Sequence, residues 1–156
     1  MNNTVNRIIN EEINKLKRSV LKENGNGPIM AHHYSNDEFE AFDKKYFGQN
    51  TEYNASENLA VTSQIGFWFN RGGKNFDDYY NVKYEAELDI KNPMHFASVE
   101  SLADEIVSYY EDAEDFVQQM EDMGYDGIEV KDEEFGGISY VAFEPGQIRI
   151  IRKIRL

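Results

Sequence analysis

Two adjacent histidines, His32 and His33, are the residues best placed to do chemistry, because Tyr34 and Ser35 follow them directly. Residues 29–35 come after a glycine-rich turn signal and predict a short strand. Side chains alternate between the two faces of a strand, so His33 and Ser35 share one face. A strand that presents an imidazole and a hydroxyl together indicates a ligand-binding edge. The simpler interpretation is a surface strand with incidental histidines.

A second candidate stretch is aromatic. Residues 64–70 predict a short strand that is opened by Gly66 and contains the run Phe67-Trp68-Phe69. Because successive side chains of a strand point to opposite faces, these three rings cannot all face one core. At least one of them is expected to line a groove or to lie under a loop. Trp68 fits a core position and a site position equally well.

The elements that would position these residues do not alternate regularly between strand and helix. Helices are expected at residues 4–23, 36–43, 75–81 and, as one or two acidic amphipathic segments, 98–122; strands are expected at 29–35, 64–70, 82–90, 128–130, 138–143 and 147–156. Residues 48–57 are polar, lack periodicity and predict a loop. This order argues against a doubly wound parallel sheet and predicts an α+β fold with antiparallel sheets.

The chain divides at the glycine-rich run that ends at Pro28. Residues 1–28 are interpreted as an N-terminal amphipathic helix and linker, and residues 29–156 as one domain. The helix would dock on the domain or meet a partner, and docking is the favoured interpretation. The basic segment 147–156 is expected to be either a final strand or a partner-binding arm.

The formal net charge of −13 is spread unevenly. Residues 1–28 carry five basic and three acidic side chains, and residues 147–156 carry four basic and no acidic ones, so the region between them is strongly acidic. Such a surface disfavours direct binding to nucleic-acid phosphates and favours solubility or basic protein partners. No apolar run approaches the roughly 20 residues that span a bilayer, and no signal-peptide core is present. We therefore expect no membrane contact and a cytoplasmic location.

Several chemistries are excluded by residue type or spacing. The chain has no cysteine, which rules out disulfides, thiolate metal sites and cysteine nucleophiles. Its three histidines have no metal-ligand spacing with a paired carboxylate, so no metal is expected. The Gly-x-Ser-x-Gly elbow of serine hydrolases and the Gly-x-Gly-x-x-Gly loop of Rossmann folds are both absent.

Four stretches together resemble a known family in their order and spacing. They are His33-Tyr34-Ser35 with Phe39-x-x-Phe42-Asp43; Gly66-Phe67-Trp68-Phe69 with Tyr79; Glu87-Leu88-Asp89-Ile90-Lys91-Asn92-Pro93; and Gly124-Tyr125-Asp126-Gly127-Ile128 with Tyr140-Val141-Ala142-Phe143-Glu144-Pro145-Gly146-Gln147-Ile148. The set, which covers roughly residues 29–150, resembles the ADP-ribosyltransferases of the diphtheria-toxin and poly(ADP-ribose) polymerase type. It is most similar to the small versions in polyvalent proteins of phages and mobile elements.

The resemblance implies a split, two-sheet β core around a cleft that holds NAD. It also implies an activity, the transfer of ADP-ribose from NAD to an acceptor with release of nicotinamide. NAD would be the substrate, and the acceptor is expected to be a host protein. If the phage origin holds, the implied location is the cytoplasm of a bacterial host.

The resemblance also implies residue roles in NAD binding. His33 would contact the adenosine-side ribose, Ser35 would be the family's hydroxyl residue, and the family's glycine between them falls on Tyr34. Gly66, Phe67 and Trp68 match the Gly-x-Tyr-Phe motif, in which the indole would stack on nicotinamide. Tyr79 would be a second stacking ring.

The catalytic glutamate of the family falls on Ser139, which is the main departure. In the family this glutamate holds a ribose hydroxyl and stabilises the cationic transition state, whereas a serine supplies no negative charge. Gln147 is a second candidate for this role. Three nearby acids, Glu129, Glu134 and Glu144, are geometric substitutes.

Two other functions remain open on the residues alone. A binding module that keeps the NAD or ADP-ribose cleft without catalysis is favoured by Ser139 and Tyr34. An acidic protein that inhibits a basic partner is favoured by the charge of the central region.

Overall fold

The computed structural model of the chain describes residues 8–13, 28–46 and 57–156. Residues 8–13 are helical, and Ile8, Ile9 and Ile13 are exposed there. The rest of the helix expected at 4–23, most of the linker before Pro28 and nearly all of the expected loop at 48–57 lie outside the described residues.

Seven strands form one mixed sheet in the order β4-β5-β6-β2-β1-β3-β7. The strands are β1 (Ile29–Ser35), β2 (Phe67–Arg71), β3 (Val82–Leu88), β4 (Pro93–Phe96), β5 (Gly127–Lys131), β6 (Ile138–Ala142) and β7 (Ile148–Arg155). Every neighbouring pair is antiparallel except β4 and β5, which are parallel. The predicted α+β class is therefore confirmed, and the strands lie in one continuous sheet.

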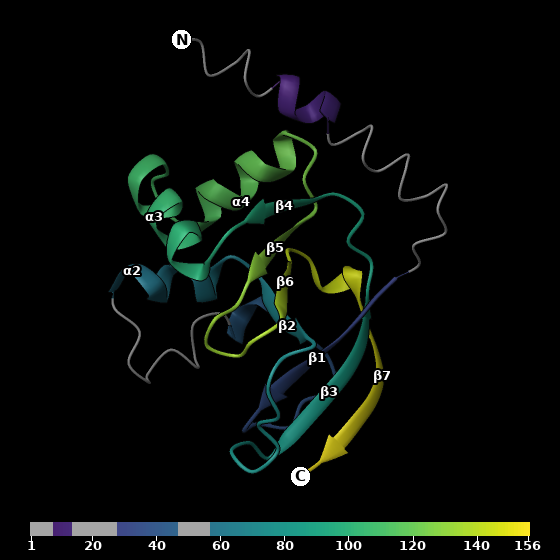
Figure 1. Cartoon of the computed structure of the whole chain (residues 1–156). Coiled ribbons are helices and arrows are strands. Elements are labelled where there is room, and N and C mark those ends of the chain that lie inside the picture. Colours follow the sequence, from purple (N-terminus) through teal and green to yellow (C-terminus); the bar gives the residue numbers. More distant parts are fainter. Residues whose placement is uncertain (1–7, 14–27, 47–56) are drawn as a thin grey trace.

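The sheet is held together most weakly between β1 and β2. These strands share a single pair in register, His32 with Asn70, whereas β1 pairs with β3 over seven positions and β2 with β6 over five. Figure 1 shows β1, β3 and β7 grouped below the other four strands. We call the β1–β2 junction the seam, because the two strands diverge on leaving this pair.

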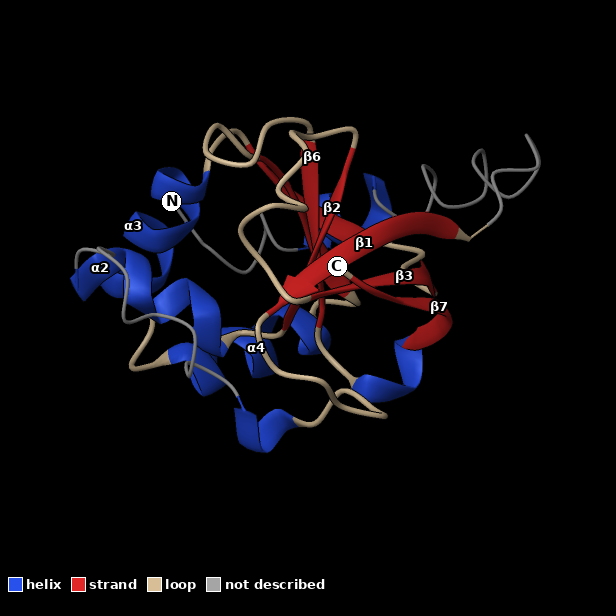
Figure 2. Ribbon diagram, turned by 90° about the horizontal axis from the view of Figure 1, so that it is seen from below, coloured by secondary structure: helices blue, strands red, loops and turns tan. Residues whose placement is uncertain are grey.

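Three α-helices lie to one side of the strands, as Figure 2 shows: α2 (Glu57–Ala60), α3 (Val99–Tyr109) and α4 (Ala113–Asp122). Short 3-10 helices are η1 (Lys44–Tyr46), η2 (Val61–Gln64) and η3 (Pro145–Gln147). The buried sides of α3 and α4 share one apolar cluster with β5 and β6, which confirms the acidic amphipathic segment. The side chains of Ser98 and Asp112 cap the two helices. In the described ranges the longest helix, α3, has 11 residues, and none could cross a membrane.

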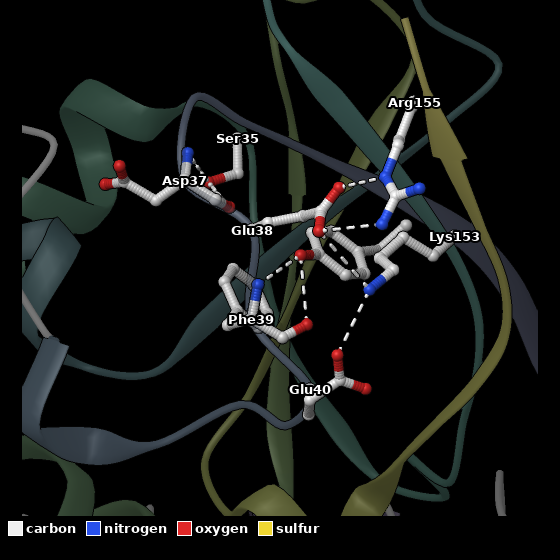
Figure 3. Close-up of polar contacts among 8 residues, drawn as sticks. Ser35, Asp37, Glu38, Phe39, Glu40, Lys153 and Arg155 are labelled. Carbon is white, nitrogen blue, oxygen red and sulfur yellow. Dashed lines mark hydrogen bonds and ion pairs between the residues drawn. The ribbon is translucent and has the colours of Figure 1, made fainter.

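The two strands beyond β1, β3 and β7, behave as their sequences predict. In β3, Val82, Tyr84, Ala86 and Leu88 are buried and the residues between them are half-buried. The basic segment at the end of the chain is a strand, β7, which pairs with β3 along its length. Figure 3 shows the cations at its end, Lys153 and Arg155, reaching Glu38 and Glu40 in the segment that follows β1.

The helix expected at residues 36–43 is wrong, because this segment is irregular in the structure. The phenolic oxygen of Tyr84 accepts a hydrogen bond from the Phe39 N–H at 2.7 Å and donates one to the Phe39 carbonyl at 3.1 Å (Figure 3). A side chain thus satisfies the backbone groups that a helix would have paired. The rings of Phe39 and Phe42 contact each other and Tyr84.

Two further expectations need correction. Residues 75–81 form a hydrogen-bonded turn, in which the Tyr79 N–H donates to the Phe76 carbonyl, where a short helix was predicted. Asn92 and Pro93 end the preceding strand as expected, but Pro93 also begins β4, which the sequence did not predict. A proline fits the first residue of an edge strand because no ladder hydrogen bond is lost there.

Replacing Tyr84 with phenylalanine should lower the free energy of unfolding by about 1–2 kcal/mol, because both backbone groups of Phe39 lose their partner. Tyr79→Phe is the matched control, since Tyr79 is exposed, and it should change stability by less than about 0.5 kcal/mol. Urea unfolding followed by circular dichroism measures both. Equal midpoints for the two variants would contradict the role given to Tyr84.

Candidate functional site

A cavity of about 690 Å³ opens at the seam, where β1 and β2 diverge. Its volume lies within the range of small-molecule sites. It is bounded by β1 and the segment after it, by β2, by η2, by the start of α3 and by the turn between β5 and β6. Seven of the nine predicted site residues line it: His33, Tyr34, Ser35, Gly66, Phe67, Trp68 and Ser139.

His33 lies where the ladder between β1 and β2 stops. Its Nδ1 is 2.7 Å from the carbonyl oxygen of Trp68, and a carbonyl only accepts, so Nδ1 carries the proton. The Nε2 atom is then the acceptor of the ring. The imidazole packs against Phe42 and Phe69, with ring centroids 5.3 and 5.7 Å away. Burial lowers the pKa of His33, with the Trp68 hydrogen bond opposing the shift, so the ring is neutral at pH 7.

The indole of Trp68 is held at one edge. Its Nε1–H donates to the carbonyl of Thr62 in η2 at 2.8 Å. The side chain is half-buried, lines the cavity and packs against the apolar cluster beneath α3 and α4. The ring is therefore fixed in orientation, as a stacking surface for a planar ligand requires.

The two residues after His33 have local partners. The Ser35 hydroxyl donates to the Asp37 carbonyl at 2.9 Å and accepts from the Asp37 N–H at 3.0 Å, which turns the chain out of β1 (Figure 3). The Tyr34 hydroxyl donates to Asp77 at 2.7 Å, and its ring stacks on Tyr80. Both residues shape the wall of the cavity.

A buried polar network lies in the wall around Ser139. The Ser139 hydroxyl donates to Asp132 Oδ2 at 2.7 Å and accepts from Asn70 Nδ2 at 3.2 Å. Asp132 is 6 % exposed, Asn70 is 7 % exposed and Ser139 is 2 % exposed, and all three line the cavity. Asn70 and Asp132 were missed from the sequence. The alternation of β2 places Asn70 on the same face as Trp68 and was a usable signal. The sequence pointed to acids near Asp132, such as Glu134, but no motif singled out Asp132 itself.

Two predicted site residues lie outside the lining. Tyr79 is 75 % exposed on the turn before β3. The Gln147 amide has structural partners: its oxygen accepts from the Glu144 N–H, and its nitrogen donates to the carbonyls of Asp89 and Asp126. Of the three acids named as substitutes, only Glu134 lines the cavity, while Glu129 lies 3.6 Å from His95 and Glu144 pairs with Lys44.

The charge of the lining is one-sided. It contains seven carboxylates and, among the described residues that line it, no Lys or Arg; the acids are Asp37, Glu38, Asp43, Glu100, Asp132, Glu133 and Glu134. Their summed field favours a cationic or neutral group inside the cavity. The described part of the chain has no cluster of three or more His, Asp or Glu side chains arranged to hold a metal ion.

Gly66 is constrained by the backbone of β6. A Cβ at this position would lie 2.4 Å from the Ala142 carbonyl oxygen, so Gly66→Ala should lower the free energy of unfolding by about 1–3 kcal/mol. Gly146→Ala is the matched control, because a Cβ at that position would meet nothing within 4 Å. Urea unfolding measures the free energy of unfolding of both variants. A Gly66→Ala protein as stable as Gly146→Ala would show that β6 moves freely there.

The lowered pKa of His33 predicts a pH-dependent stability. Between its folded and unfolded pKa values the unfolded state binds more protons, so stability falls as pH drops below about 6.5. The non-titrating variant His33→Asn should lose less stability from pH 7 to pH 5, by at most about 1.4 kcal/mol per pH unit. Burial also lowers the pKa of His32, so the variant keeps part of the dependence of stability on pH. Parallel slopes in urea unfolding at each pH would contradict the assignment.

Comparison of the chain with family models, with curated proteins and with solved structures finds no match. The chemistry of the seam cavity and the motifs that line it are therefore the basis for inferring a function.

Proposed function

We propose that this chain is an NAD-dependent mono-ADP-ribosyltransferase that binds NAD in the seam cavity. One observation carries the proposal: the cavity gathers His33 from β1, Trp68 from β2 and Ser139 from β6 around one space. These are the positions that the resemblance to ADP-ribosyltransferases assigns to ribose binding, ring stacking and catalysis. They are far apart in the sequence, so it is the fold, and not a local sequence pattern, that brings them together in one cavity.

The contacts of these residues suit the parts of NAD. A neutral imidazole with its proton on Nδ1 presents Nε2 as an acceptor for a ribose hydroxyl. An indole fixed at its Nε1–H offers a face to the nicotinamide ring. Phe39, Phe42 and Phe67 give the cavity apolar walls, which suit the faces of the planar rings of NAD.

The acidic lining affects the two charged parts of NAD, the nicotinamide ring and the diphosphate, in opposite ways. The nicotinamide ring of NAD is cationic, so a lining rich in carboxylates favours it. The diphosphate would meet no Lys or Arg among the described lining residues, and in this proposal it lies toward the mouth, where water solvates it. The exposed acids at the mouth also favour a basic protein as the acceptor.

The sheet gives this proposal further support. A single pair joins the four strands β4, β5, β6 and β2 to the three strands β1, β3 and β7. A sheet joined so weakly approaches the split, two-sheet core that the family resemblance implies, with the cleft between the halves.

A binding module for NAD or ADP-ribose without catalysis is the second candidate. The observation that favours it is the hydrogen bonding of Ser139, whose hydroxyl proton is committed to Asp132. A serine in this state presents only a weak acceptor to a ribose. The module would bind the same ligand in the same cavity and release no nicotinamide.

The deciding experiment measures nicotinamide release from NAD by the purified protein, with a cell lysate as the source of acceptors. His33→Ala should lower kcat/KM by about 10- to 100-fold, the effect of one lost hydrogen bond to substrate. His95→Ala is the control, because His95 lies outside the cavity lining, and it should match the parent.

Each outcome of this assay points to one function. Nicotinamide release with labelling of a lysate protein supports the transferase and reveals the acceptor. No release, together with an NAD-dependent rise in melting temperature, supports the binding module. Absence of both effects at millimolar NAD rules out both candidates, and equal activity of His33→Ala and His95→Ala rules out the assigned site.

A further inference from the structure

The cavity wall contains a buried carboxylate, that of Asp132. Asp132 comes directly after β5, is 6 % exposed and lines the cavity. Burying a carboxylate is costly unless it is hydrogen-bonded. Asp132 accepts three hydrogen bonds: Oδ1 accepts from the N–H groups of Glu134 and Phe135, and Oδ2 accepts from the Ser139 hydroxyl.

The direction of the hydrogen bonds around Ser139 is fixed by a neighbouring carbonyl. Asn70 Nδ2 lies 2.8 Å from the carbonyl oxygen of Gly136, which only accepts, so this atom of the amide is the nitrogen. The same nitrogen donates to Ser139 Oγ, and the hydroxyl proton therefore points to Asp132. The hydrogen bonds therefore run from the Asn70 amide through the Ser139 hydroxyl to the Asp132 carboxylate. A negative charge thus lies in hydrogen-bond contact with the side chain of Ser139.

From this network we infer that Asp132 is a catalytic residue, which together with Ser139 holds a hydroxyl of the nicotinamide-side ribose and supplies the negative charge that position 139 lacks. The inference rests on the proposed function. In the reaction the bond between the ribose C1′ and the nicotinamide nitrogen breaks, and its electron pair neutralises the ring nitrogen. The C1′ cation then forms a bond to a nucleophile of the acceptor protein, which loses its proton to solvent.

The negative charge of Asp132 would stabilise the transition state because of where it lies. Positive charge develops on the ribose only as the bond breaks, so a fixed carboxylate nearby stabilises the transition state more than the bound substrate. The effect is larger in a cavity from which water is excluded than at a surface. Removal of the charge should therefore lower kcat and leave KM nearly unchanged.

A structural role for Asp132 is the competing explanation, because its Oδ1 also holds the turn between β5 and β6. Asparagine keeps an oxygen for the N–H groups of Glu134 and Phe135 and removes only the charge. Asp104→Asn is a matched control: Asp104 is exposed on α3, lies outside the cavity lining, and loses the same charge by the same substitution.

The experiment compares Asp132→Asn, Asp104→Asn and the parent by nicotinamide release from NAD, with melting temperatures as a check on folding. Asp132→Asn should lower kcat by about 100-fold or more with KM within about threefold, as expected for loss of one transition-state stabiliser. Asp104→Asn should stay within about twofold. Ser139→Ala, which removes the hydroxyl link and keeps the carboxylate, should lower kcat by about tenfold and serves if Asp132→Asn fails to fold.

The failures can be told apart. An active parent whose kcat Asp132→Asn retains within about threefold overturns the role of Asp132 alone. If Asp132→Asn does not fold, full activity of Ser139→Ala overturns it. A rise in KM with kcat unchanged assigns Asp132 to shaping the cavity and also overturns its catalytic role. A parent that releases no nicotinamide overturns the proposed transferase and this inference together.

Discussion

The hydrogen bond between His33 Nδ1 and the Trp68 carbonyl is the interaction on which the site depends. A backbone carbonyl left unpaired where two strands separate would be costly if buried. At the seam a side chain takes the place of the missing ladder partner, so the strands diverge without leaving Trp68 unsatisfied. The same bond sets the tautomer of the imidazole and anchors the strand that presents the indole. This one hydrogen bond thus allows the two strands to separate and also orients the imidazole of the site.

The opening at the seam keeps its outer wall because the segment after β1 is tied to β3 and β7, in the same half of the sheet as β1. The segment after β1 has no regular structure of its own, and its backbone is held by the Tyr84 hydroxyl. Glu38 and Glu40 add ion pairs to the end of β7, although such exposed pairs each contribute little. The buried hydroxyl is therefore the more important tie. The wall keeps its shape through tertiary contacts, and a helix is not needed.

Sequence patterns predicted the parts of the fold that depend on local alternation. The strand at 82–90 follows directly from alternating buried and half-buried positions, whereas the strand at 138–143 is buried at nearly every position and was predicted from its run of apolar residues. The segment 36–43 misled, because its capping and apolar spacing were helical while Tyr84 in a distant strand satisfied its backbone. The site was predictable where a motif carried it, as at His33 and Trp68. The contact between Asn70 and Ser139 joins residues 69 positions apart, and no local pattern reports such a meeting.

The two edges of the sheet differ in how they discourage pairing with another chain. β4 is four residues long and begins with a proline, so it offers few free backbone groups. β7 is twice as long and carries Arg149, Arg152, Lys153 and Arg155 along its length. These four side chains pair with glutamates on β3 and in the segment after β1, so another strand that paired with β7 would crowd a row of long, ion-paired side chains. The ion pairs along β7 thus do more than join it to its neighbours, because they also discourage edge-to-edge pairing of the longest strand among the described residues.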